Sequence, residues 1–279
     1  MRYIDPLIDF SFKKIFGSEP NKDLLIDFLN GIFRGSRQIT DLVYNRNEHT
    51  GDREDAGTVI FDLVCTGQDG RQFLIEVQRS NQTNLKKRMV YYFSKLIADQ
   101  APKGRRAEWN YNITEVYVIV LMDGFVIPGN SSGHYLHDIC LCNRESGEVF
   151  YKELGFVFLE LASFGKDEEN LETDLDQWLY VLKNMSKMDE LPLYLRKPVF
   201  DKLFNIAEYT KLNREDQQMY DVSLKRKWDE KNTRDYARQQ GLEEGLEQGL
   251  ERARSELVHS LIAEFAFSDE QAAKACKVT

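Results

Sequence analysis

The chain has 279 residues, of which 42% are hydrophobic and 12% aromatic, so it can form a large hydrophobic core and is not globally disordered. Its formal net charge of −9 excludes a uniformly basic nucleic-acid-binding protein, so any contact with DNA must use a local basic patch. No apolar run of about 18 residues predicts a membrane span, the N-terminus lacks a signal-peptide pattern, and the four cysteines are too scattered for a disulfide framework, so we expect a cytoplasmic protein.

In the first hundred residues, the sequence pattern predicts two N-terminal helices followed by a β-hairpin. Asp5-Pro6 is typical of a helix N-terminus. Asp69-Gly70 lies between two stretches rich in Val, Ile, Phe and Leu, as in a β-hairpin. The expected elements are helices over 5–16 and 18–33, a strand within 38–47, hairpin strands over 58–66 and 72–78, and an amphipathic helix over 83–100.

The rest of the chain changes in composition near residue 165. Val116–Met122 is almost continuously apolar, which is typical of a strand covered on both faces. Shorter strands are expected at 137–143, 147–151 and 156–161, and helices at 171–185, 195–211 and 215–240. This order predicts an α/β protein with a mixed central sheet flanked by helices, followed by an all-α region. We expect three parts: a core over 1–165, a helical region over 166–240 and a helical tail over 241–279.

The register of the hairpin decides whether two carboxylates meet. Side chains alternate between the faces of a strand, and the odd-numbered residues of both hairpin strands are apolar, whereas Asp62, Glu76 and Gln78 are even-numbered. A two-residue loop would pair Asp62 with Val77. A three-residue loop over 68–70 pairs Asp62 with Glu76 and needs a positive φ at its last position, where Gly70 stands. We predict the three-residue loop; a bulge near Asp62 would have the same effect.

Opposed carboxylates repel each other across a sheet pair, and a divalent cation would offset that repulsion. Oxygen ligands suit Mg²⁺ or Mn²⁺, so Asp62 and Glu76 are candidate metal ligands. The simpler interpretation is a hydrated polar strand face. A second group, His134, His137, Cys140 and Cys142, has side chains that zinc prefers, but its spacing is not that of a zinc site.

The segment after the hairpin is basic. Between Arg79 and Arg106 there are eight Lys or Arg residues and one acid, a local charge of +7. One interpretation is a helix whose Lys87 and Arg88 face the phosphates of DNA beside the carboxylates. The alternative is an ordinary solvated helix face.

The tail contains a regular row of glycines. Gly241, Gly245 and Gly249 recur at every fourth residue, and each costs a helix about 1 kcal/mol relative to alanine. We interpret the row as a surface for close helix–helix approach, and hence for a homo-oligomer. The alternative is a weakly helical tether. The final stretch resembles the start of a helix-turn-helix but lacks a full recognition helix.

Six blocks of sequence, in this order, carry a family resemblance. They are DFSFKKIFG (9–17), NKDLLIDFLNGI (21–32), FDLVCTGQDGRQFLIEVQ (61–78), KKRMVYYFSKLIADQAPKG (86–104), WNYNITEVYVIVLMD (109–123) and GLEEGLEQGLE (241–251). With them the chain resembles the Rpn family of recombination-promoting nucleases and transposases, of the Bacteroidetes type, in the PD-(D/E)XK nuclease superfamily. The resemblance implies a restriction-endonuclease-like core and a metal-dependent DNA endonuclease associated with recombination or transposition.

The superfamily motif maps onto the hairpin. Asp62 occupies the aspartate position, and Glu76-x-Gln78 occupies the (D/E)-x-K position, with glutamine in place of the usual lysine, as in Rpn-like members. No proline precedes Asp62. Under this hypothesis Asp62, Glu76 and the Val77 carbonyl bind Mg²⁺ or Mn²⁺, and Gln78 positions the attacking water.

Three cations complete the hypothesis: Arg88 and Lys87 hold the DNA backbone, and Lys13 adds a contact. A neutral amide cannot supply the charge of a lysine, so an alternative is a catalytically inactive nuclease fold that binds DNA or oligomerises. In a third interpretation the helical C-terminus is the working part and the sheet is its scaffold.

Overall fold

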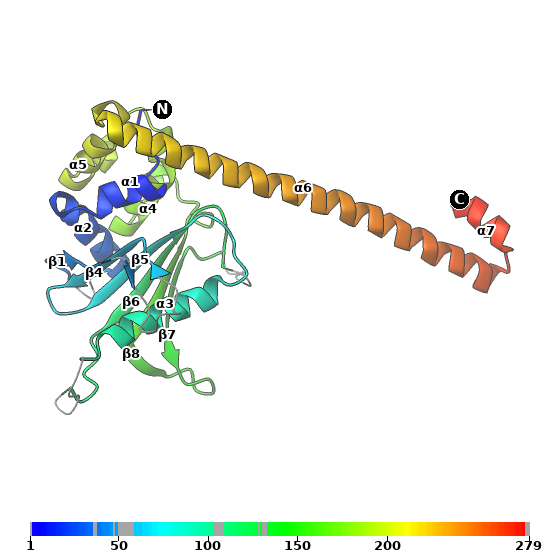
Figure 1. The fold of residues 1–279 in the computed structure, drawn as a ribbon, viewed down its shortest axis with the longest axis horizontal. Coiled ribbons are helices and arrows are strands. Elements are labelled where there is room, and N and C mark those ends of the chain that lie inside the picture. Colours follow the sequence, from blue (N-terminus) through cyan, green and yellow to red (C-terminus); the bar gives the residue numbers. More distant parts are fainter. Residues whose placement is uncertain are drawn as a thin grey trace. The chain divides into compact units, whose positions relative to one another are not determined.

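A six-stranded mixed sheet is the centre of the fold (Figure 1). The computed structural model describes residues 2–35, 38–46, 48–49, 59–102, 109–127, 129 and 133–276. It divides into two compact units, 1–223 and 224–279. The strands are β1 Leu42–Tyr44, β2 Glu48–His49, β3 Val59–Ile60, β4 Leu63–Gly67, β5 Gln72–Gln78, β6 Val116–Met122, β7 Leu136–Cys142 and β8 Val149–Glu160. The helices are α1 Asp9–Phe16, α2 Lys22–Phe33, α3 Leu85–Asp99, α4 Asp174–Asn184, α5 Pro198–Ala207, α6 Arg214–Phe265 and α7 Asp269–Cys276.

The sheet has the order β1-β4-β5-β6-β8-β7. β5 runs parallel to β6 and β6 parallel to β8, while the other neighbours are antiparallel. Strand β6 is buried along its whole length, as its continuous apolar run predicted. The expected α/β class, a mixed sheet flanked by helices, is confirmed.

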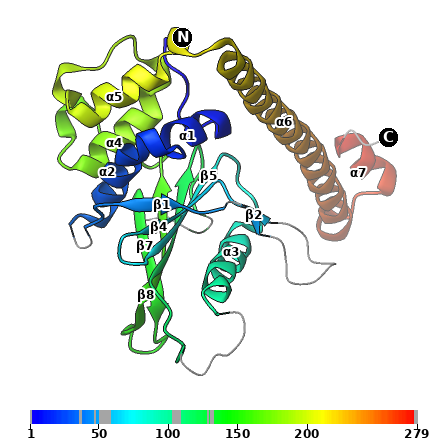
Figure 2. The same cartoon turned by 60° about the vertical axis from the view of Figure 1, so that its left-hand side comes forward.

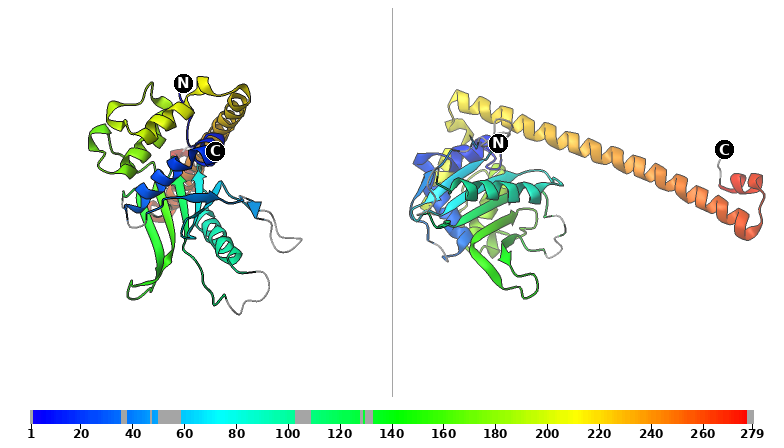
Figure 3. Two further views of the ribbon diagram at one scale, coloured as in Figure 1. Left: turned by 90° about the vertical axis from the view of Figure 1, so that its left-hand side faces the viewer. Right: turned by 60° about the horizontal axis from the view of Figure 1, so that its bottom comes forward.

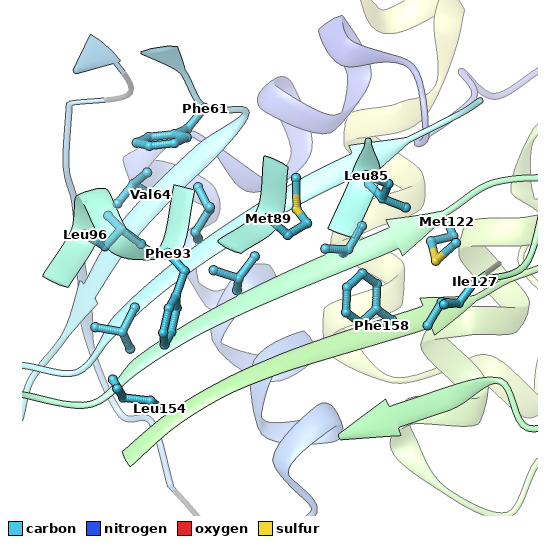
Figure 4. Packing of buried hydrophobic residues seen from close by; sticks show 14 residues of the cluster. Phe61, Val64, Leu85, Met89, Phe93, Leu96, Met122, Ile127, Leu154 and Phe158 are labelled. Atoms are coloured by element: carbon cyan, nitrogen blue, oxygen red, sulfur yellow. The ribbon is translucent and has the colours of Figure 1, made fainter. Parts of the chain in front are cut away.

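Helices cover both faces of the sheet (Figure 2). On one face, α3 packs its apolar stripe onto even-numbered residues of the central strands. Figure 4 shows this cluster, whose buried members include Phe61, Val64, Leu74, Leu85, Met89, Phe93, Leu96, Val118, Val120, Met122 and Phe158. On the other face, Phe33 of α2 contacts the rings of Phe73 and Tyr117. Both faces of the hairpin are therefore core, whereas the sequence predicted a single apolar face.

The predicted hairpin register is confirmed. Leu63 pairs with Ile75 and Thr66 with Gln72, and the Gly67 N–H donates to the Arg71 carbonyl at 2.8 Å. The loop is therefore 68–70, with Gly70 at φ 83°. This register brings Asp62 level with Glu76.

The first hairpin strand is not continuous, contrary to the expectation of one strand over 58–66. β3 pairs with β2, regular pairing stops at Phe61 and Asp62, and β4 starts at Leu63. The break turns Phe61 into the α3-side cluster, although its odd number predicted the opposite face. Thr58 lies outside the described residues.

Three other boundaries differ from expectation. The first helix starts at Asp9 rather than at Asp5-Pro6, because Asp5 Oδ1 accepts the Leu7 N–H at 3.0 Å and holds a turn before the helix. The second helix begins with a short 3₁₀ turn at Glu19. The strands expected at 147–151 and 156–161 are one strand, β8, although its pairing with β7 shifts register between Tyr151 and Gly155.

Helices α4 and α5 pack against the N-terminal helices. The indole of Trp178 contacts the rings of Phe16, Phe28 and Phe200, and its Nε1–H donates to Asp27 at 2.6 Å. Thr173 caps α4 through a reciprocal hydrogen-bonded box with Asp176. Residues up to 223 thus share one compact unit. The three-part division of the chain stays a prediction.

The second unit consists of most of α6 and of α7. α6 continues without a break through all three glycines of the tail (Figure 3). α7 follows a turn in which Ser268 and Gln271 exchange hydrogen bonds. Within the described ranges, no helix combines the length and the apolarity needed to cross a bilayer.

Candidate active site

Asp62, which directly precedes β4, and Glu76 on β5 each accept a hydrogen bond from the main chain of the other segment. Glu76 Oε1 accepts the backbone N–H of Asp62 at 3.1 Å. Asp62 Oδ2 accepts the backbone N–H of Val77 at 2.8 Å. These two bonds link the segment before β4 to β5 at the point where regular strand pairing is interrupted. The residues that the sequence predicted to meet do meet.

The pair is poorly solvated. Glu76 is 7% exposed and Gln78 also 7%, while Asp62 and Val77 are partly exposed. Burial raises the pKa of the Glu76 carboxyl and the neighbouring Asp62 raises it further, to about 8. Burial likewise raises the pKa of Asp62, against the lowering effect of the hydrogen bond from Val77. The positive charges of Arg88 and Lys13 lower both pKa values.

Gln78 does not offer a free amide to this site. Its Oε1 accepts a hydrogen bond from the guanidinium of Arg88, and its Nε2 donates to the Ser80 carbonyl at 2.8 Å. Arg88 also donates to Gln82 Oε1 at 2.7 Å. Gln78 thereby fixes a permanent cation beside the two carboxylates. The predicted role of Gln78, positioning a water, stays a prediction.

Tyr92 is a site residue that sequence reasoning missed. Its spacing along α3 is that of the apolar stripe, which predicts a core residue. Burial raises the pKa of its hydroxyl, and the charges of Glu76 and Asp62 raise it further, so the phenol lies within electrostatic range of the pair. The ring packs edge-on against Phe61, with centroids 5.0 Å apart, and under Arg88 at 5.8 Å. Tyr92 follows Arg88 by four residues, one helical turn, so this spacing could have indicated that the two side chains lie near the same site.

Lys13 and Lys87 differ in their electrostatic relation to the two carboxylates. Lys13 of α1 forms an ion pair with Asp9 at 2.8 Å, and its charge acts on both carboxylates. Lys87 is exposed on α3 and is not among the charges that shift the pKa of either acid. Lys103, Arg105 and Arg106 of the basic segment lie outside the described residues.

The donor set fits a hard divalent cation. Two carboxylates converge in a buried place where their mutual repulsion disfavours ionisation of both, and a cation would remove that cost. In the part of the chain that the structure describes, no third His, Cys, Asp or Glu joins them. Mg²⁺ commonly has such a shell, because it uses one or two carboxylates and completes its coordination with water and substrate oxygens.

The His and Cys residues of β7 do not assemble a second metal centre. Cys140 and Cys142 are exposed, and His137 Nε2 lies 3.3 Å from the buried carboxylate of Glu160. Glu160 in turn accepts the Ile127 N–H and the Ser163 hydroxyl, each at 2.8 Å. These contacts are those of a structural anchor for the turns after β6 and β8.

Comparison with known proteins gave a family match. The family model described as PD-(D/E)XK nuclease family transposase matches residues 6–237. The match covers the hairpin, α3 and the whole sheet, so the fold is of the restriction-endonuclease-like α/β type. Neither the curated proteins nor the solved structures contain a match.

Proposed function

Because the chain belongs to the PD-(D/E)XK nuclease family transposases, we propose that it is a metal-dependent endonuclease that hydrolyses phosphodiester bonds in DNA. The family itself points to nuclease activity linked to transposition. The proposal adds the reaction, its metal dependence and the residues that carry it out. A cytoplasmic location stays a prediction.

The reciprocal bracing of Asp62 and Glu76 carries the proposal. Two carboxylates held by backbone N–H groups at 3.1 Å and 2.8 Å keep their relative position without needing a cation to order them. Such preorganisation is what metal-dependent phosphoryl chemistry requires of its ligands. A merely hydrated strand face would not bury Glu76.

Asp62, Glu76 and the Val77 carbonyl would hold Mg²⁺ or Mn²⁺. When bound, such an ion supplies a more acidic water and neutralises charge on the scissile phosphate. The chain's own residues do the rest. The backbone bonds orient the two carboxylates, and the partly exposed side of Asp62 is open to the substrate. The hydrophobic cover from Phe61 and Tyr92 limits the access of bulk water.

Arg88 takes the part that lysine has in the superfamily motif. Gln78 accepts a hydrogen bond from its guanidinium and Gln82 accepts another, so the charge is fixed next to the acids. A guanidinium can stabilise the negative charge that develops on the phosphate during hydrolysis. The glutamine in the motif is therefore a positioning residue, and the cation comes from α3.

DNA would reach the pair between α1 and α3. Lys13 on α1 and Arg88 on α3 both act electrostatically on the carboxylates, so a phosphate at the pair would be near both. Lys87, exposed one residue before Arg88, would contact the backbone farther from the cleaved bond. Such contacts provide affinity without sequence preference.

Cleavage of supercoiled plasmid with Mg²⁺ tests the proposal. Asp62→Asn and Glu76→Gln keep the shape of each side chain and remove its charge, and both should abolish nicking. Asp138→Asn is the matched control, since Asp138 is an exposed acid on the edge strand β7. Equal cleavage by the wild type and Asp62→Asn would refute the assignment.

The second candidate is a nuclease fold that has lost catalysis and only binds DNA or oligomerises. The engaged amide of Gln78 favours it, because the motif supplies no charge of its own. Calorimetry discriminates: a functional site binds Mn²⁺ with a heat that Glu76→Gln removes, whereas a degenerate site gives none. If deletion beyond residue 240 instead removes activity while metal binding persists, the helical C-terminus is the working part.

A further inference from the structure

Four leucines of one stripe on α6 are exposed in the described chain, while Leu261 at its end is partly buried. Leu242 is 73% exposed, Leu246 65%, and Leu250 and Leu257 are each 52% exposed. All lie in the second compact unit, over 224–279. Single exposed leucines are ordinary, but a row on one helix face indicates a surface that is buried by a partner.

The spacing of the stripe fits helix pairing. Leu242, Leu246, Leu250, Ala253, Leu257 and Leu261 follow one another at intervals of four, four, three, four and four residues. The pattern repeats after eleven residues, which is close to the natural period of an α-helix and typical of nearly straight or right-handed helix pairs. The six side chains therefore stay on one face along α6.

The glycines of α6 have no packing role inside the chain. A Cβ added at Gly241, Gly245 or Gly249 would meet nothing within 4 Å among the described residues. Glycine disfavours a helix relative to alanine, so their presence calls for another reason. With about 100° per residue, Gly245 and Gly249 lie along one flank of the leucine stripe, where a small residue allows another backbone to come close.

We propose that a second copy of this chain covers the stripe in an antiparallel helix pair. The intervals read the same in both directions, so an antiparallel copy matches every layer: Leu242 with Leu261, Leu246 with Leu257, and Leu250 with Ala253. Such self-complementarity is the property of a twofold-symmetric interface. A partner of different sequence would not require it.

The two flanks of the stripe select the antiparallel direction. An antiparallel pair brings like flanks together. The flank that carries Gly245 and Gly249 then faces the same flank of the second copy. On the opposite flank, Glu247 lies near Arg254 of the second copy, and this contact occurs twice by symmetry. A parallel pair would set Glu247 against the glycine flank. Opposite charges beside an apolar seam are the usual means of fixing helix orientation.

The mass of the full chain in solution is the first test. Sedimentation or light scattering should give twice the 32.6 kDa of the single chain. Leu246→Glu should give the single-chain mass, since glutamate keeps helix propensity but cannot enter an apolar seam. Gln248→Glu, on the face away from the stripe, is the control and should remain a dimer. A monomeric wild type, a dimeric Leu246→Glu or a monomeric Gln248→Glu would each overturn the proposal.

Disulfide trapping tests the direction. With the exposed thiols of Cys140 and Cys142 replaced by serine, a tagged Leu246→Cys chain is mixed with an untagged Leu257→Cys chain and oxidised. The antiparallel pair should give the mixed disulfide, because only those two positions come within bonding distance. A Leu246→Cys chain that links to itself would show a parallel pair and refute the assignment.

Charge reversal provides a rescue that a general loss of folding could not mimic. Glu247→Arg should weaken the dimer by placing like charges opposite each other, and Glu247→Arg with Arg254→Glu should restore it. Failure of the double variant to restore the dimer counts against the proposed register. The outcome is independent of nuclease activity, because none of these residues lies in the first compact unit.

Discussion

Glu76 accepts the backbone N–H of Asp62, and Asp62 accepts the backbone N–H that follows Glu76 in the chain. Each carboxylate thus satisfies a main-chain donor where regular strand pairing has stopped. Charge and main-chain geometry are coupled at this site, so substitutions should separate into those that keep the acceptor oxygen and those that remove it.

We expect the metal-free protein to lose stability as the pH rises from about 4.5 to 8. The pKa of Glu76 is raised to about 8 by burial and by Asp62, so the folded state holds a proton that the unfolded state releases in this window, and stability falls with pH. The loss attributable to Glu76 should be on the order of 4–5 kcal/mol. Urea unfolding in a chelator should show it in the wild type.

Glu76→Gln is the control for that pH dependence. It keeps an acceptor for the Asp62 N–H but cannot ionise, so its stability should vary less across the same range. Glu76→Ala leaves that N–H unpaired and should cost about 1–3 kcal/mol at every pH. Identical pH profiles for wild type and Glu76→Gln would contradict the assigned pKa.

Arg88 should matter for the rate more than for DNA affinity. Arg88→Met removes the guanidinium that Gln78 and Gln82 hold, and kcat should fall by about 10²-fold or more, as on removal of one transition-state donor. Arg88→Lys should recover only part of the rate, because an ammonium cannot reproduce the planar fork of donors. Single-turnover cleavage with saturating enzyme separates the two effects; a purely affinity-based loss would disprove the role.

Lys87 should show the opposite behaviour. It is exposed and is not among the main causes of the carboxylate pKa shifts, so Lys87→Met should weaken binding of all DNA sequences about equally. The slope of log K against log salt should become shallower by about 1, the value for one phosphate contact. Fluorescence anisotropy in a titration of salt measures it, and an unchanged slope would place Lys87 outside the interface.

Asp176 should protect the fold against acid. Burial alone would raise its pKa, but hydrogen bonds from Tyr135, Lys166 and Thr173 outweigh burial and lower it to about 2. Its contribution is present above pH of about 4 and is lost as the pH falls toward 2. We expect about 2 kcal/mol.

Asp176→Asn measures that contribution. Its unfolding free energy should be lower than that of the wild type at pH 6, and the two should converge near pH 2. Glu172→Gln is the matched control, since its carboxylate is exposed and also contacts Lys166, while its backbone N–H, which donates to Asp176, is unchanged by the substitution. A constant difference between wild type and Asp176→Asn at all pH values would contradict the lowered pKa.

The register of the hairpin could be read from the sequence, while the arrangement around the acids could not. Alternation of side chains and the glycine at position 70 set which residues meet. The break at Phe61 depends on side chain–backbone bonds across the sheet, which no periodicity records. Likewise, the sequence indicates that Arg88 is a cation on the basic helix, but it does not predict the hydrogen bond from Arg88 to Gln78.

Tyr92 and strand β8 were missed for the same kind of reason. Helical spacing assigns Tyr92 to the apolar stripe but does not predict the position of its hydroxyl group relative to the acids. β8 passes through a register shift between Tyr151 and Gly155, and the polar residues Lys152 and Glu153 at that shift are typical of a gap between two strands. The local sequence pattern predicted the helix and the strands, whereas contacts between distant segments determine where these elements begin and end.

The left-handed turn at Gly70 sets the register of β5 and thereby determines the face on which Glu76 lies. Six residues of extended chain, about 20 Å, separate it from Glu76, and its φ of 83° is one that side-chain-bearing residues seldom adopt. A turn that gained or lost one residue would shift the strand by one step and send Glu76 to the face covered by α2. The acid pair can therefore be dismantled from a loop that touches neither member.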